Sequence, residues 1–131
     1  MSIKKILIIG IVLSLIAISV ASAATIEDQI DKILTDEGYK VGDVAKNVSD
    51  FDFIKTYNKN SDEVLVGYEP GYTISLDDFE PGFEDKTIGN TQGIYKENST
   101  GYYFHFNHGN DAILIKAPDK AIIEKLATIG N

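Results

Sequence analysis

The sequence contains no cysteine and no arginine, and it has only two histidines. Without cysteine the chain cannot form disulfides, use a thiolate nucleophile, bind zinc through sulfur or carry a lipid on a cysteine. Without arginine, and with so few histidines, few side chains can clamp an anion or exchange a proton near neutral pH. The chain also lacks a nucleophile elbow, a His-Glu-x-x-His motif, a phosphate-binding loop and a dinucleotide-binding glycine pattern. We therefore expect a non-catalytic protein without a cofactor.

The N-terminus has the pattern of an export signal. Lys4 and Lys5 are followed by an apolar stretch over 6–24, which contains the small-residue sequence Ala21-Ser22-Ala23. A charged start, an apolar run and an Ala-x-Ala site are typical of a signal peptide, so we predict that residues 1–23 are removed. The alternative is an uncleaved anchor, because about 20 apolar residues are enough to span a bilayer. In both cases the two lysines stay in the cytoplasm and the rest of the chain lies outside it.

Residues 24–131 are expected to form one domain, because their number is close to the commonest domain size. The formal net charge of the whole chain is −8, and it becomes −10 once Lys4 and Lys5 are removed. An acidic surface repels nucleic acid and anionic lipid headgroups. We therefore expect no nucleic-acid partner, and membrane contact only through residues 1–23 if they are not cleaved.

Two amphipathic helices are predicted near the ends of this domain. Residues 25–37 begin with Thr25 as N-cap and end at Gly38, and their apolar residues recur at helical spacing. A second helix is expected to begin at Pro118 and Asp119 and to end at Gly130. The apolar positions in the two helices are Ile26, Ile30, Ile33 and Leu34, and Ile122, Ile123, Leu126 and Ile129.

Between the helices, short β-branched and aromatic segments alternate with turn residues, which is typical of antiparallel strands. The residues of 112–115 are apolar on both faces, so this segment should lie centrally in the sheet. In the acidic loop 77–86, Phe79 and Phe83 are expected to fold the loop back onto the domain. The fold class is therefore α+β: a two-layer domain in which the two helices bracket an antiparallel meander and cover one face, the other face being more polar. The five or six predicted strands are 51–57, 63–68, 72–76, 91–96, 102–107 and 111–116.

His105, His108 and Asp111 are the candidates for a zinc site. Two histidines three residues apart occur at zinc sites, but here they span a strand end and a turn, and only a carboxylate could complete the set. Surface histidines in a hairpin are the default interpretation, so no metal is expected.

Aromatic residues are frequent in the predicted strands, and Tyr95, Tyr103 and His105 are candidates for contacting a partner. An exposed aromatic row would suit stacking on sugar rings or on a protein, whereas the competing interpretation places the aromatic residues in the core. Asn47 and Asn98 each begin an Asn-x-Ser/Thr sequence and are candidates for glycosylation.

The lysine-containing start, the isoleucine-rich N-terminal segment, the abundance of Asn, Asp, Lys and Ile and the lack of cysteine resemble small exported proteins of methanogenic archaea. This resemblance is one of composition and implies an envelope or extracellular setting. We expect a non-catalytic extracytoplasmic module, secreted or in the cell envelope, that binds another protein or an envelope polymer. The alternatives are a membrane-tethered accessory subunit of a membrane complex and, third, a small hydrolase that uses two carboxylates.

Overall fold

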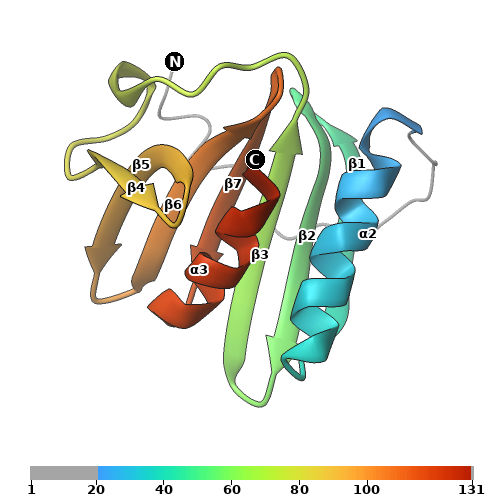
Figure 1. Cartoon of the computed structure of the whole chain (residues 1–131). Helices are drawn as coiled ribbons and strands as arrows, with labels where there is room; N and C mark the ends of the chain where they lie inside the picture. The colour runs from blue at the N-terminus through green and yellow to red at the C-terminus, as the bar shows by residue number, and fades with distance from the viewer. Residues whose placement is uncertain (1–20, 131) are drawn as a thin grey trace.

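Seven antiparallel strands form one sheet in the computed structural model, which describes residues 21–130. Their order across the sheet is β1-β2-β3-β7-β6-β5-β4 (Figure 1). Strands β1, β2 and β3 form one group of consecutive hairpins, and strands β4, β5, β6 and β7 form another. The pairing of β3 with β7 joins the two groups into one sheet. The strands are β1 (Lys40–Val48), β2 (Phe51–Lys59), β3 (Asp62–Glu69), β4 (Glu84–Ile88), β5 (Thr91–Asn98), β6 (Gly101–His108) and β7 (Asp111–Ala117).

The predicted two-layer fold with a meander of five or six strands is wrong. The sheet has seven strands, and β3 pairs with β7 instead of with β4, the next strand in the sequence. Segment 72–76 is not a strand, and β1 and β4 were missed. These two are the edge strands, and most of their side chains are exposed, so they lack the apolar alternation by which a strand is recognised.

Strand β7 lies in the middle of the sheet, which confirms the prediction for 112–115. Ile113 and Ile115 are buried on one face, and Ala112 and Leu114 are buried on the other. A central strand is covered on both faces, so it needs apolar residues at consecutive positions.

Helices α2 (Ala21–Asp36) and α3 (Lys120–Ala127) pack on the same face of the sheet, which we call the helix face (Figure 1). The short 3-10 helix η2 (Thr128–Gly130) follows α3 directly. In α3, Asp119 is the N-cap and its carboxylate accepts a hydrogen bond from Ile122 N at 3.0 Å. The helices bury their apolar residues at the predicted positions Ile26, Ile30, Leu34, Ile122, Ile123, Leu126 and Ile129.

Helix α2 begins earlier than predicted. Thr25 lies inside the helix, which starts at Ala21, so Thr25 is not the N-cap. The helix ends as expected, because Gly38 adopts a φ of 93° and Tyr39 N donates to Leu34 O at 3.0 Å. Apart from the last three residues, the predicted signal or anchor segment 1–23 lies outside the described residues. Within residues 21–130, no helix combines the length and the apolar character needed to cross a membrane.

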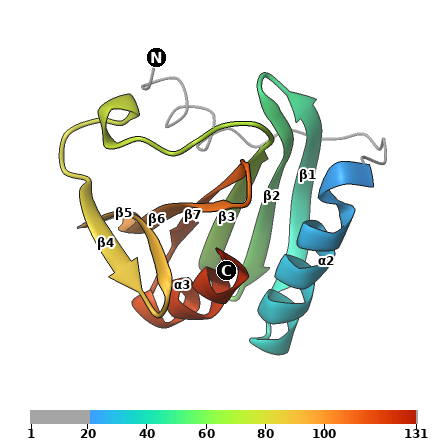
Figure 2. The same ribbon diagram turned by 45° about the horizontal axis from the view of Figure 1, so that its top comes forward.

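The opposite face is covered by the connection from β3 to β4, residues 70–83, which we call the strap (Figure 2). Phe79 and Phe83 are 7% and 8% exposed and belong to the same apolar cluster as Ile94 and Leu114. The prediction that these two rings fold the loop back is confirmed, but the prediction of a more polar second face is wrong. The domain therefore has helices on one side of the sheet and an aromatic strap on the other, which we call the strap face.

Candidate functional site

His105 is completely buried on the strap face, between two aromatic rings of the strap. Its ring centroid lies 4.9 Å from that of Phe79 and 5.0 Å from that of Phe83. Within residues 21–130 neither ring nitrogen has a hydrogen-bond partner. Burial, reinforced by the nearby Lys96 ammonium, lowers the pKa of His105 to about 3, so the imidazole is neutral at neutral pH. His105 is a core side chain here, and it contacts neither the surface nor the other two candidate metal ligands.

The other candidate metal ligands are also held by internal contacts. His108 and Asp111 face each other across the β6–β7 hairpin, and His108 Nδ1 donates to Ile129 O at 2.7 Å. The Asp111 carboxylate accepts hydrogen bonds from Tyr68 OH and, at 2.9 Å, from Gly71 N. In the described part of the chain, no three metal-binding side chains come together.

Asn107 fastens the strap to the sheet. Its side-chain amide nitrogen donates to Tyr72 O at 2.8 Å and to Asp111 O at 2.9 Å, and its oxygen accepts from Ile74 N at 2.9 Å. One side chain of β6 thus satisfies two backbone groups of the strap, on either side of Thr73. Two further side-chain contacts hold the rest of the strap, Tyr72 with Asp78 and Lys96 with Glu80.

The three predicted partner-contacting side chains do not form one exposed row. Tyr95 is 4% exposed and packs in the helix-face core, whereas Tyr103 and His105 lie on the strap face. Tyr103 is half-buried, and its ring has the Lys96 and Lys116 ammonium groups at 5.5 and 5.7 Å from its centroid. Neighbouring positions on antiparallel strands share a face only in the correct register, and Tyr95 pairs with Phe104, not with Tyr103.

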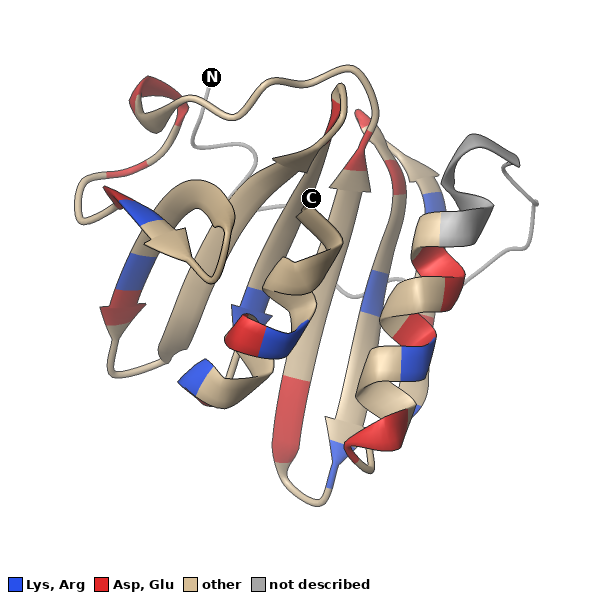
Figure 3. Ribbon diagram, in the orientation of Figure 1, with Lys and Arg blue, Asp and Glu red and all other residues tan. Residues whose placement is uncertain are grey.

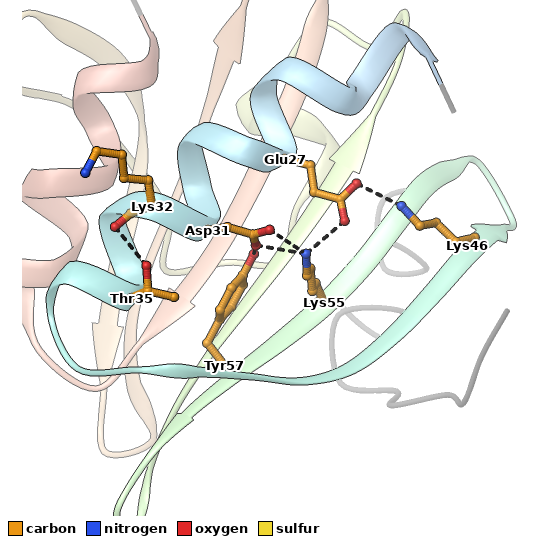
Figure 4. A network of polar contacts seen from close by, with 7 residues as sticks. All are labelled: Glu27, Asp31, Lys32, Thr35, Lys46, Lys55 and Tyr57. Atoms are coloured by element: carbon orange, nitrogen blue, oxygen red, sulfur yellow. Dashed lines mark hydrogen bonds and ion pairs between the residues drawn. The ribbon is translucent and has the colours of Figure 1, made fainter. Parts of the chain in front are cut away.

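A network of buried charges joins α2 to β1 and β2 (Figure 4). Lys55 is 5% exposed, and its Nζ lies 2.8 Å from both Glu27 Oε2 and Asp31 Oδ1. Tyr57 OH donates to Asp31 at 2.6 Å, and Lys46 reaches Glu27 at 2.8 Å. Burial alone would lower the pKa of Lys55, but the hydrogen bonds to both carboxylates outweigh it and raise that pKa. The network positions α2 on the sheet, since each buried charge is paired.

Among the described residues, surface clefts open on the helix face on each side of α3. The first is a cleft of about 440 Å³ between α2 and η2, with Ile33 and Ile129 beside Gln29 and Lys32. Charges of both signs lie on α2 and α3, which border the clefts (Figure 3). We call this first cleft the α2–η2 cleft.

The second cleft has a volume of about 390 Å³ and lies between the β4–β5 hairpin and α3. Its polar lining comes from Lys86, Thr87, Lys120 and Glu124, and we call it the β4–α3 cleft. The ammonium groups of both lysines lie over the ring of Tyr95, which forms part of the core beneath them. A third cavity of about 240 Å³ lies between the strap and β5.

The two sequon asparagines are both exposed. Asn47 lies in edge strand β1 with a φ of 55°. Asn98 ends β5, and its side-chain oxygen accepts hydrogen bonds from Thr100 N and Oγ1 at 2.8 and 2.6 Å. Glycosylation at either position stays a prediction.

Neither helix-face cleft can be read from the sequence, because each is lined by segments far apart in the chain. In the β4–α3 cleft, Lys86 and Lys120 come from the strand that was read as a loop and from the closing helix. Comparisons with protein-family models, with curated proteins and with solved structures found no match to this chain.

Proposed function

We propose that the protein is a non-catalytic extracytoplasmic module that binds its partner through the helix face. The observation that carries this proposal is the pair of clefts that border α3 on this face. Their volumes, about 440 and 390 Å³, lie in the range of natural ligand sites. The lining of each cleft is mostly polar, with Ile33 and Ile129 as the apolar residues of one cleft and Ile88 as that of the other. Such a lining favours a polar ligand that can form hydrogen bonds.

The distribution of charged contacts supports binding rather than acid–base chemistry. Lys55, Glu27 and Asp31 hold α2 on the sheet, and Asp111 and Asn107 hold the strap. The polar side chains around the clefts are instead directed to the surface of one rigid face. A face built on a central sheet and braced by buried pairs keeps a fixed shape, and this lowers the entropy cost of binding.

A photo-crosslinking experiment in the protein's own host tests this proposal. A photoreactive residue replaces Gln29 in the α2–η2 cleft, or Thr87 in the β4–α3 cleft, and the protein is illuminated in whole cells. Thr73, which is exposed on the strap, is the matched control position. We expect crosslinked adducts from at least one cleft position and none from Thr73.

Adducts at Thr73 alone would overturn the assignment of the helix face. The absence of adducts from all three positions would contradict a binding module. The intact mass of the same preparation tests the location: a species that begins at Ala24 in the extracellular fraction supports export with cleavage. A full-length species retained in the membrane would instead support the tethered form.

A further inference from the structure

We propose that the β4–α3 cleft binds the carboxylate of a small hydroxylated acid, the chemistry presented by a single uronic acid. This inference rests on the proposed function, because it names the ligand of one of the two helix-face clefts. The observation behind it is the convergence of Lys86 and Lys120 on one aromatic ring in a protein that is otherwise acidic.

The two ammonium groups come from different elements, line the same cleft and each contact the ring of Tyr95. Lys86 Nζ lies 4.8 Å from the centroid of the Tyr95 ring, and Lys120 Nζ lies 5.7 Å from it. Both distances are within the range of a cation–π interaction. The contact holds each lysine at the cleft while its N–H groups remain able to donate to a ligand.

The environment of Tyr95 strengthens this arrangement. The ring is 4% exposed, and its hydroxyl donates to Glu97 Oε1 at 2.7 Å. Burial and this carboxylate raise the pKa of Tyr95, so the phenol stays protonated and remains a donor. Donation to a carboxylate makes the ring richer in electrons, which favours cations at its face.

Neither Lys86 nor Lys120 forms an ion pair with another of the described residues. This holds even though Glu124 lies one helical turn after Lys120 and lines the same cleft. Two ammonium groups that line one cleft attract an anion into it.

The other lining groups narrow the class of anion. Glu124 can only accept hydrogen bonds when ionised, and Thr87 Oγ1 can both donate and accept. A ligand with one carboxylate and several hydroxyl groups satisfies all four side chains, because its hydroxyls donate to Glu124. A multiply charged anion such as phosphate is repelled by Glu124, and a neutral sugar leaves the two ammonium groups unpaired.

Titration of the purified protein with small probes tests the assignment, with binding followed by amide chemical shifts in solution. The probes are sodium glucuronate, glucose and inorganic phosphate, and the variants are Lys86→Gln, Lys120→Gln and both together. Lys32→Gln is the matched control, since Lys32 is an exposed lysine that lines the other cleft. Each variant is checked first for an unchanged thermal unfolding midpoint.

We expect saturable shifts around the β4–β5 hairpin and α3 with glucuronate. Each single variant should weaken binding about tenfold, which is the effect of losing one charge-assisted contact. The control should bind as the unchanged protein does, and added salt should weaken binding because the charges are solvent-accessible.

Binding of glucose or phosphate with the same affinity as glucuronate would overturn the assignment of a hydroxylated carboxylate. So would an unchanged affinity in the double variant. If the titration shows no specific glucuronate binding but crosslinks still form from Gln29 or Thr87, the ligand class is rejected and the proposed function stands. A failure of both experiments would reject both proposals.

Discussion

The buried imidazole of His105 predicts a loss of stability between about pH 7.5 and about pH 5. The ring is enclosed by Phe79 and Phe83, and burial lowers its pKa from 6.5 to about 3. In the unfolded chain the imidazole takes up a proton as the pH falls below 6.5, whereas in the folded protein it does not. The unfolded state therefore binds more protons in this window, and the free energy of unfolding falls as the pH is lowered.

The size of the effect follows from the same two pKa values. Each pH unit below the unfolded pKa costs about 1.4 kcal/mol, so the loss at pH 5 is about 2 kcal/mol. Protonation of Glu27 contributes little to the change in stability between pH 7.5 and pH 5. Burial alone would raise the pKa of Glu27, but its hydrogen bonds with Lys46 and Lys55 outweigh burial and lower it below 4.5. The stability that depends on Glu27 ionisation is therefore lost only at a pH below that value.

Urea unfolding followed by far-UV circular dichroism, at a series of pH values, measures this effect. The variant His105→Leu replaces the imidazole by an apolar side chain that suits the space between two phenylalanines. It should be at least as stable as the unchanged protein at pH 7.5, because it removes two unpartnered polar atoms from the core. Its free energy of unfolding should be nearly constant down to pH 5.

The control is His108→Gln, which removes the other histidine and should keep the pH dependence of the unchanged protein. The reasoning is refuted if His105→Leu loses stability with falling pH as steeply as the unchanged protein. It is refuted as well if the unchanged protein shows no loss of stability between pH 7.5 and pH 5.

Three further substitutions test the packing of the domain. Lys55→Met should lower the free energy of unfolding in urea by about 3 kcal/mol, because it leaves Asp31 without a cation and Glu27 with Lys46 alone. Lys32→Met, at an exposed pair, should change it by less than about 1 kcal/mol. Asn107→Ala should speed hydrogen exchange and proteolysis within the strap, and equal protection in both proteins would contradict its fastening role. Gly93→Ala should unfold at a lower temperature than Gly71→Ala. The Cβ at position 93 would lie 2.4 Å from a backbone oxygen of β6, whereas the Cβ at position 71 meets nothing within 4 Å and is strained only by its φ of 72°.

The local patterns of the sequence were enough to locate both helices and five strands. Their signals are the apolar periodicity of α2 and α3, the alternation along β6 and the unbroken apolar run of β7. Each is a property of consecutive residues, which is why it can be read without the fold. The edge strands β1 and β4 were not predicted, because most of their side chains are exposed and show no apolar alternation.

The candidate site was less predictable than the fold. Tyr95, Tyr103 and His105 are all aromatic strand residues, but the register of β5 with β6 places Tyr95 on the helix face and the other two on the strap face. A shift of one residue in register would exchange those faces, and no pattern of consecutive residues reveals the register.

The acidic balance, the absence of thiol chemistry, both helices and the central position of β7 can be read from consecutive residues. The pairing of β3 with β7, the enclosure of His105 by the strap and the contacts of Lys86 and Lys120 with the Tyr95 ring appear only in the folded chain. These features join residues that are far apart in the chain. They depend on which elements pack together, because burial and the approach of charges are set by distance in space rather than along the sequence.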